Sequence, residues 1–320
     1  MKTRELGTSG IQITPIITGT WQAGKTQWVG IDDADTIAAL RAAVDAGITS
    51  IDTAEVYGKG HSEQIVGEAL ASVRDRVVYM TKVFANHLKY DQVIAACENS
   101  LQNLKTDYID LYQIHWPSGS WNSEVVPIEE TMQALNDLKQ QGKIRAIGVS
   151  NFSRTQLEEA MQFGRIDSLQ PPYSLFWRYV EQDLMPYCVE QKISILAYSP
   201  LAQGLLTGRF QRGHQFAPED VRSKSKLFQG ENFERALDAL NKLKPIAERH
   251  HTSLGNLALA WLIAQPQTSA IVGVRNADQA IQNAQAAEIT LSDAEIAEMS
   301  AIGLAVFEPM QDGNPVMWTF

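Results

Sequence analysis

The sequence has few features of a secreted or membrane-bound protein. It contains only two cysteines, Cys97 and Cys188, in 320 residues. Both lie in segments with the pattern of amphipathic helices, so we expect buried thiols in a reducing compartment rather than a disulfide. No apolar run approaches the ~18 residues that a membrane-spanning helix needs, and residues 1–10 lack the apolar core of a signal peptide. The sequence therefore predicts a cytoplasmic protein with no membrane contact.

The chain also lacks a surplus of basic residues. Its 37 Asp and Glu residues outnumber 27 Lys and Arg residues, and the formal net charge is −10. Charges of both signs are dispersed along the chain, which argues against a general surface for nucleic acid or anionic lipid. A polyanionic ligand would need a local basic site.

Short apolar or β-branched segments alternate with longer segments of helical periodicity. The predicted strands are 13–19, 48–52, 77–83, 109–115, 144–150, 168–170, 193–199 and 269–274. Near-continuous apolar strands separated by helices indicate a parallel sheet covered by helices, and eight such units favour a closed (β/α)₈ TIM barrel of class α/β. The segment "RELGTSGIQIT" (4–14) predicts an N-terminal β-hairpin that caps the barrel floor.

A doubly wound sheet is the competing architecture. When such a sheet binds a dinucleotide, it usually has a G-x-G-x-x-G turn after its first strand, and this chain has none. No low-complexity segment or long linker divides the sequence. We therefore expect a single domain over residues 1–320, with two domains as the alternative.

Four chemically useful side chains follow three successive predicted strands. Asp52 ends one strand, Tyr57 follows on its loop, Lys82 lies near the end of the next, and His115 ends the third. In a barrel of this kind the active site lies at the carboxyl ends of the strands. Each residue alone has an ordinary explanation, such as a helix cap for Asp52 or a solvated charge for Lys82. Together they predict one catalytic cluster.

Their chemistry predicts a proton donor. A nearby Lys82 ammonium is expected to lower the pKa of the Tyr57 phenol, and the Asp52 carboxylate to pair with that ammonium. His115 is expected to donate a hydrogen bond to a carbonyl oxygen that becomes an alkoxide. The cluster contains no nucleophilic serine and no metal site, so a hydride donor would complete the reaction.

The sequence resembles the aldo-keto reductase superfamily over nearly its whole length. The similar segments are "GTW" (19–21), "IDTAEVYG" (51–58), "TKV" (81–83), "IHWP" (114–117), "GKIRAIGVSNF" (142–152), "AYSPLAQGLLTG" (197–208) and "IVGVRNADQAIQN" (271–283). The resemblance implies that Asp52, Tyr57, Lys82 and His115 are the catalytic tetrad, with Tyr57 as the general acid. It also implies that NADP(H) binds in an extended conformation to reduce aldehydes, and ketones as well.

Further residues are predicted to bind the cofactor. Ser150, Asn151 and Gln170 would bond the nicotinamide carboxamide, although Asn151 is also a candidate helix N-cap. Tyr198 would stack on the nicotinamide ring. Arg209 would bind the pyrophosphate, and Arg275, unless it is a solvated surface residue, would bind a 2′-phosphate near a helix N-terminus. The remaining predicted cofactor residues are Gly19, Thr20, Trp21, Asp52, Ser199, Pro200, Leu201, Gln203, Gly204, Gly273, Gln279, Gln282 and Asn283.

Aromatic residues near the strand ends predict the substrate pocket. Trp21, Tyr57, Phe84, His115 and Trp116 are the predicted substrate-binding residues. Trp121 and Trp177 are further candidates for its wall, which suits an apolar or aromatic small-molecule carbonyl. We expect a monomer.

Two other functions fit the same barrel. In a lyase or aldolase, Lys82 would form a Schiff base with the substrate, but a paired Asp52 would hold that lysine charged. In a regulatory or interaction subunit, NADPH would be sensed and not consumed.

Overall fold

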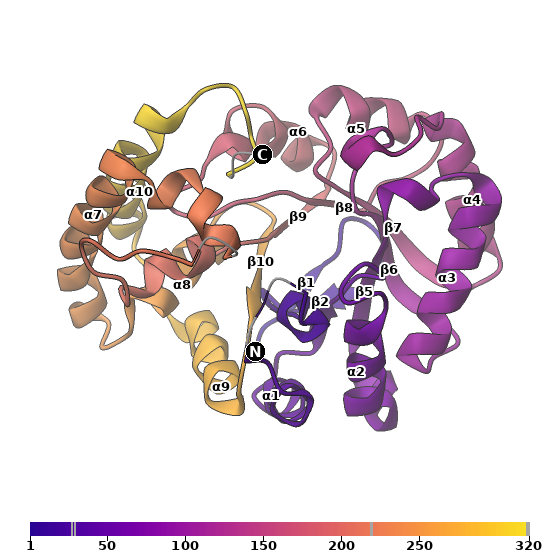
Figure 1. Cartoon of the computed structure of the whole chain (residues 1–320), viewed down its shortest axis with the longest axis horizontal. Coiled ribbons are helices and arrows are strands. Elements are labelled where there is room, and N and C mark those ends of the chain that lie inside the picture. The colour runs from indigo at the N-terminus through magenta and orange to yellow at the C-terminus, as the bar shows by residue number, and fades with distance from the viewer. Residues whose placement is uncertain (27, 29, 218–219, 318–320) are drawn as a thin grey trace.

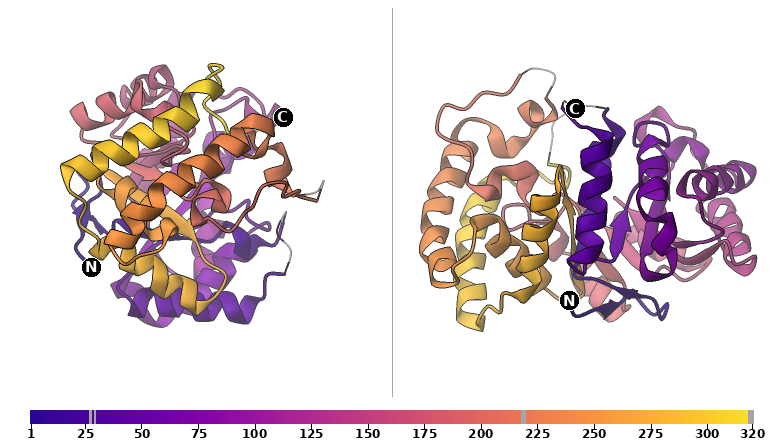
Figure 2. Two further views of the ribbon diagram at one scale, coloured as in Figure 1. Left: turned by 90° about the vertical axis from the view of Figure 1, so that its left-hand side faces the viewer. Right: turned by 90° about the horizontal axis from the view of Figure 1, so that it is seen from below.

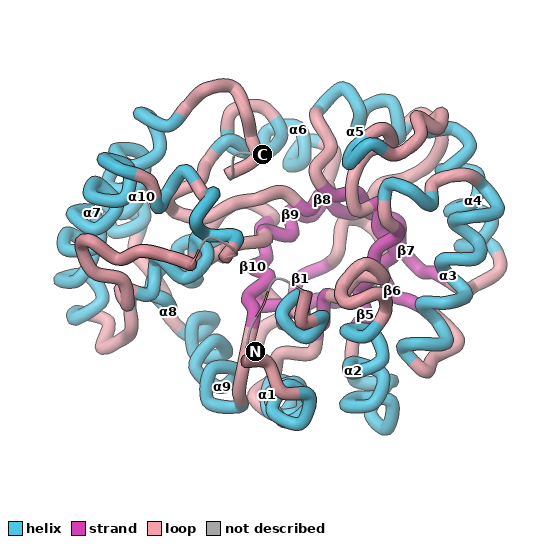
Figure 3. Tube along the Cα trace, in the orientation of Figure 1, coloured by secondary structure: helices cyan, strands magenta, loops and turns pink. Residues whose placement is uncertain are grey.

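The strands form a closed parallel barrel surrounded by helices (Figures 1 and 3). The computed structural model describes residues 1–26, 28, 30–217 and 220–317. The barrel strands pair in the order β10-β3-β4-β5-β6-β7-β8-β9. They are β3 (Ile16–Gly19), β4 (Ser50–Asp52), β5 (Val78–Val83), β6 (Ile109–Ile114), β7 (Ile144–Ser150), β8 (Ser168–Gln170), β9 (Ser194–Ala197) and β10 (Thr268–Gly273). The predicted (β/α)₈ barrel is confirmed.

The helices lie between successive strands and at the end of the chain. The α-helices are α1 (Asp33–Asp45), α2 (His61–Leu70), α3 (Tyr90–Leu104), α4 (Ile128–Gln140), α5 (Arg154–Met161), α6 (Leu184–Glu190), α7 (Gly230–Arg249), α8 (Leu254–Ile263), α9 (Ala277–Gln285) and α10 (Asp293–Phe307). The 3₁₀ helices are η1 (Trp21–Gly24), η2 (Ala71–Arg76), η3 (Ala85–His87), η4 (Ser120–Asn122), η5 (Tyr179–Glu181), η6 (Ala202–Thr207), η7 (Val221–Lys224), η8 (Lys226–Phe228), η9 (Ala286–Glu288) and η10 (Glu308–Met310).

The predicted hairpin forms and closes the barrel floor. Its antiparallel strands are β1 (Arg4–Glu5) and β2 (Gln12–Ile13). The Gly7 N–H donates to Ser194 Oγ (2.8 Å) and the Thr8 N–H to Asp167 Oδ1 (3.3 Å), at the starts of β9 and β8. The buried Leu6 side chain packs into the apolar barrel interior. Figure 2 shows the hairpin, drawn in indigo near the N-terminus, at one end of the barrel.

The barrel interior changes from apolar to polar along the strands. Met80 and Leu111 belong to an apolar layer inside the barrel. Lys82 and Gln113 lie two residues further on, so they share the inward face of β5 and β6 and are paired in register. Both side chains are fully buried. The buried polar side chains inside the barrel therefore lie toward its carboxyl end.

Gly148 makes room for this polar layer. A Cβ at this position would lie 2.9 Å from Gln113 Cγ and 2.2 Å from Ser168 Oγ. A side chain on this part of β7 would therefore displace the residues that reach the centre of the barrel.

The predictions about the cysteines, the membrane and the number of domains have different outcomes. Cys97 in α3 and Cys188 in α6 are buried free thiols, as predicted. None of the helices described is long and apolar enough to cross a membrane. That residues 1–320 form one domain stays a prediction.

Candidate active site

A buried ion pair joins β4 to β5 at the carboxyl end of the barrel. Lys82 Nζ donates to Asp52 Oδ1 (2.7 Å) and to the Thr53 carbonyl oxygen (2.7 Å). Gln170 Nε2 donates to the other carboxylate oxygen of Asp52 (2.9 Å), and Gln113 Nε2 lies 3.5 Å from the same oxygen. Burial lowers the pKa of Lys82, and the negative charge of Asp52 opposes that change. The predicted pairing of Asp52 with Lys82 is confirmed.

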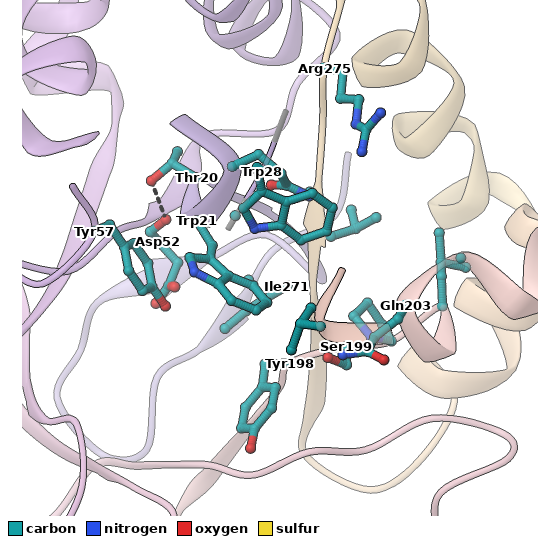
Figure 4. A pocket seen from close by; sticks show the side chains of 18 of the residues that line it. Thr20, Trp21, Trp28, Asp52, Tyr57, Tyr198, Ser199, Gln203, Ile271 and Arg275 are labelled. Atoms are coloured by element: carbon teal, nitrogen blue, oxygen red, sulfur yellow. Dashed lines mark hydrogen bonds between the residues drawn. The ribbon is translucent and has the colours of Figure 1, made fainter. Parts of the chain in front are cut away.

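Tyr57 lies beside this ion pair. Lys82 Nζ is 5.1 Å from the centre of the Tyr57 ring, and Figure 4 shows the Tyr57 phenol close to Asp52. A glycine contact fixes the loop: a Cβ on Gly24 would lie 2.6 Å from the Tyr57 carbonyl carbon, and one on Gly58 only 2.4 Å from the Gly24 carbonyl oxygen. The η1 loop and the Tyr57 loop can touch backbone to backbone only because both residues are glycines.

The expected direction of the Tyr57 pKa shift is wrong. Burial raises the pKa of the phenol well above its usual value, and the negative charge of Asp52 raises it further. The positive charge of Lys82, 5.1 Å from the ring centre, does not outweigh these two effects. Tyr57 is therefore a neutral phenol at neutral pH and still carries the proton that a general acid needs.

His115 is held between two aromatic rings at the cavity wall. Its ring lies edge-on to Tyr57 and to Phe84, with centroids 5.6 Å apart in each pair. Burial and the charge of Lys82 lower the pKa of His115 well below its usual value. The imidazole is therefore neutral at neutral pH, and it can donate a hydrogen bond but holds no ionisable proton to give away.

Asn151 connects β7 to β9. Its Nδ2 donates to the His115 carbonyl oxygen (3.1 Å) and to Ser150 Oγ (3.0 Å), while its Oδ1 accepts from the Tyr198 hydroxyl (2.8 Å). It is not a helix cap, because Ser153 caps α5. Asn151 therefore fixes the Tyr198 ring at the cavity wall.

One cavity of about 910 Å³ collects the predicted site residues. All of the predicted cofactor and substrate residues line it, and their roles stay predictions. Lys82 does not line it and lies behind Asp52. Trp121 and Val56 line it as well.

The candidate role of Trp177 in the pocket wall is wrong. Its side chain is fully buried, its Nε1 donates to the Pro315 carbonyl oxygen (2.7 Å), and its ring packs against Tyr179 and Phe307. The chain after β8 carries this residue into the core beneath the C-terminal segment, so Trp177 cannot meet a substrate.

The other end of the cavity is cationic. Arg209, Lys224 and Arg275 line it. Burial, followed by the charges of Arg222 and Arg275, lowers the pKa of Arg209, and no described carboxylate forms an ion pair with Arg209 or Arg275. Such a group of positive charges in a chain of net charge −10 favours an anionic ligand at this place.

The loop after β9 borders the same end. Ser199 and Gln203 have left-handed backbone conformations (φ 53° and 55°), as does Gly204 (φ 93°). Both side-chain polar atoms of Gln203 are buried without a hydrogen-bond partner among the described residues. Buried amides are normally bonded, so this loop is shaped for a polar ligand.

Sequence reasoning missed Gln113, Lys224 and Trp28. Gln113 sits two residues after an inward-facing Leu111, so strand alternation could have found it. Lys224, at the end of η7, and Trp28, in the loop after η1, also line the cavity, and no spacing rule predicts either position.

The arrangement can donate a proton and bind an anion. Among the described residues no group of His, Cys, Asp or Glu could hold a metal ion. The chemistry available is that of a neutral phenol beside a neutral imidazole, with an ion pair behind them.

The chain is similar to known proteins over most of its length. Residues 15–303 match the model of the aldo/keto reductase family. The chain is 40% identical to aldo-keto reductase YhdN of Bacillus subtilis, over 87% of this chain and 86% of that protein. It is 35% identical to the NADH-specific methylglyoxal reductase of Escherichia coli, over 96% and 99% of the two chains.

Solved structures with similar sequences have a similar fold. A glycerol dehydrogenase from Gluconobacter oxydans superimposes with a TM-score of 0.87 at 35% identity, covering 99% of this chain and 98% of that one. An aldo/keto reductase from Klebsiella pneumoniae, solved with NADP and acetate, gives 0.76 at 33% identity, covering 100% and 99%.

The ion pair predicts a non-additive effect on stability. Lys82→Met leaves Asp52 charged and unpaired in the barrel, so it should lower the free energy of unfolding by about 3–5 kcal/mol. The double variant Asp52→Asn/Lys82→Met removes both charges and should be more stable than the sum of the two single losses implies. Urea unfolding of the four proteins measures this. Strictly additive losses would contradict the coupling.

His115 predicts a loss of stability in acid. Its pKa is lowered in the folded state, so the unfolded chain binds the proton more readily, and stability falls as the pH drops below the unfolded value of ~6.5. At pH 5, proton binding by the unfolded chain lowers the free energy of unfolding by up to about 2 kcal/mol. His115→Gln should lose that part of the pH dependence in urea unfolding between pH 7.5 and 5. Parallel profiles for the two proteins would show that His115 does not titrate this way.

Proposed function

The chain belongs to the aldo/keto reductase family of oxidoreductases, and on that basis we propose that it reduces aldehydes, and ketones as well, to alcohols with NADPH. The observation that carries this proposal is the single cavity that joins the Tyr57 phenol and His115 to a cationic end. Proton donation and anion binding are the two demands of such a reaction. The assignment to the cytoplasm and to a monomer stays a prediction.

The cationic end fits a phosphorylated dinucleotide. Arg209 and Arg275 would bind its phosphates, and the unpartnered Gln203 amide offers both a donor and an acceptor to the ribose-phosphate chain. Tyr198, whose hydroxyl is fixed by Asn151, offers its ring to the nicotinamide. A volume of about 910 Å³ is at the upper end of ligand pockets, which suits a long cofactor together with a small substrate.

When bound, NADPH supplies a hydride to the carbonyl carbon. Tyr57 gives its proton to the carbonyl oxygen as negative charge develops there. Neutral His115 donates a hydrogen bond to that oxygen and orients it. Lys82 lies 5.1 Å from the ring centre and stabilises the phenolate that remains, while Asp52 holds the ammonium in place.

The carbonyl end favours an uncharged substrate. Trp21, Phe84, Trp116, Trp121 and Val56 line it, and Trp116 and Trp121 pack edge-on with centroids 5.5 Å apart. None of the described residues that form this aromatic surface is a cation that could bind a carboxylate or phosphate. We therefore expect small neutral carbonyl compounds, including aromatic ones.

The structure argues against the lyase alternative, whereas the regulatory alternative is tested by an assay. A Schiff base at Lys82 would need its Nζ to reach the substrate, but Nζ is bonded to Asp52 and Thr53 behind the cavity wall. A regulatory subunit would bind NADPH without steady turnover, so the assay below separates it from the reductase.

Tyr57→Phe tests the reaction and its acid. A panel of neutral aldehydes and ketones, assayed by loss of NADPH absorbance, should give steady turnover with the parent protein. The variant keeps the ring and loses the proton, so kcat should fall by at least ~10²-fold while the Kd for NADPH barely changes. Normal turnover by the variant would place the proton donor elsewhere, and no turnover by the parent would refute the reductase.

Arg275→Ala tests the choice of cofactor. If Arg275 binds the 2′-phosphate, the parent should bind NADPH more tightly than NADH, and the variant should lose about 1.5–3 kcal/mol of that preference. Calorimetric titration with both cofactors measures it. Equal affinity of the parent for the two cofactors would remove the basis of this assignment.

A further inference from the structure

Ser62 has a fully buried side chain that the proposed reaction does not use. It is the second residue of α2. Its Oγ lies 2.7 Å from Thr20 Oγ1 and 2.9 Å from the Thr20 carbonyl oxygen, directly after β3. The same Oγ lies 3.0 Å from Thr53 Oγ1, directly after β4. One hydroxyl group from the helix therefore binds the residues that follow two neighbouring barrel strands.

The three hydroxyl groups form a chain of hydrogen bonds that ends at Asp52. Each hydroxyl has one proton to donate, and Thr20 Oγ1 donates its own to the Asp52 carbonyl oxygen (3.0 Å), as Figure 4 shows. The Ser62 hydroxyl can then donate to Thr20, and the Thr53 hydroxyl to Ser62. Every proton in the chain has an acceptor. A buried polar network that is fully satisfied holds its members in one arrangement.

The backbone of Ser62 joins Tyr57 to this network. Its N–H has no acceptor inside the first turn of α2, and it donates to the Tyr57 carbonyl oxygen (3.2 Å). The carbonyl oxygen of Thr53 accepts from Lys82 Nζ (2.7 Å). Ser62 is therefore bonded directly to Tyr57, and the two residues that its hydroxyl binds are themselves bonded to the buried ion pair.

The next residue, Glu63, fixes the start of α2 to β5. Its fully buried carboxyl group accepts from Thr81 Oγ1 (2.6 Å) and from Asn103 Nδ2 (3.1 Å). Thr81 directly precedes Lys82 on β5. A movement of the first turn of α2 would therefore break bonds near the ends of three strands.

We propose that Ser62 is a positioning residue that holds the Tyr57 phenol against the Asp52–Lys82 ion pair. The inference rests on the proposed function, in which Tyr57 donates the proton. A misplacement of about 1 Å in a reacting group can cost ~10²-fold in rate. Ser62 does not line the cavity, so its loss should slow proton donation and leave the binding of ligands almost unchanged.

Ser62→Ala is the informative variant. With a neutral aldehyde, kcat should fall by about 10- to 100-fold. The Kd for NADPH should stay that of the parent, because Thr20 keeps both of its bonds to the Asp52 carbonyl oxygen. The solvent deuterium isotope effect on kcat should increase, because a misplaced phenol donates its proton more slowly. A role in stability alone would not change the isotope effect of the folded protein.

Thr53→Val tests the same network if Ser62→Ala does not fold. Valine has a similar shape and keeps the carbonyl oxygen for Lys82, but it lacks the hydroxyl. We expect kcat to fall by about 3- to 10-fold, the loss of one hydrogen bond, with a larger solvent isotope effect. The double variant Ser62→Ala/Thr53→Val should be no slower than Ser62→Ala, because both changes break the same contact.

Ser50→Ala is the matched control. Ser50 is also fully buried, and its Oγ accepts from the Thr14 N–H (3.0 Å). It lies at the start of β4, at the opposite end of that strand from Asp52. The variant should lower the midpoint of thermal unfolding, as Ser62→Ala does, and keep the kcat, the Kd for NADPH and the isotope effect of the parent.

Three results with an active parent would overturn the inference. An unchanged kcat and isotope effect in Ser62→Ala, or in Thr53→Val, would show that Tyr57 is held without this network. Losses that multiply in the double variant would show that the two hydroxyls act separately. An equal loss of kcat in Ser50→Ala would show that lost stability explains the result. A parent without turnover would instead refute the proposed function, and the inference with it, before any variant is compared.

Discussion

The buried ion pair of Asp52 and Lys82 is the interaction on which the mouth of the barrel depends. Two charges without solvent are stable together only when further hydrogen bonds satisfy their remaining donors and acceptors. Here Thr53, Gln113 and Gln170 supply those bonds. The pair therefore orders residues from β4, β5, β6 and β8, and it also sets the electrostatic surroundings of Tyr57 and His115.

The cavity is divided by charge although the chain is strongly acidic. Cations gather at the end bordered by β10 and the loop after β9, whereas aromatic rings border Tyr57 and His115. Each end would select by a different force: charge would attract an anion from a distance, and desolvated aromatic surface would favour a neutral carbonyl. The two ligands of the proposed reaction would thus bind at opposite ends of one cavity.

Residues at strand ends could be predicted from sequence, whereas contacts made by loops could not. Alternation and strand position are local properties, so the barrel and the cavity-lining positions of Asp52, Tyr57 and His115 followed from the pattern. Trp28 and Trp177 both lie in loops, and nothing local distinguishes the one in the cavity from the one in the core. The pKa of Tyr57 depends on burial, which the sequence pattern does not determine.

Burial of Tyr57 affects when its proton can leave. A phenol whose pKa was lowered toward neutrality would lose protons to water before any substrate arrived, and phenolate cannot donate. Raised by burial and by Asp52, the pKa keeps the proton on Tyr57. A carbonyl oxygen is too weak a base to take it and becomes strong enough only as it acquires alkoxide character. In the proposed reaction, Tyr57 would therefore keep its proton until the carbonyl oxygen acquires that character, and Lys82 would offset part of the charge left on the ring.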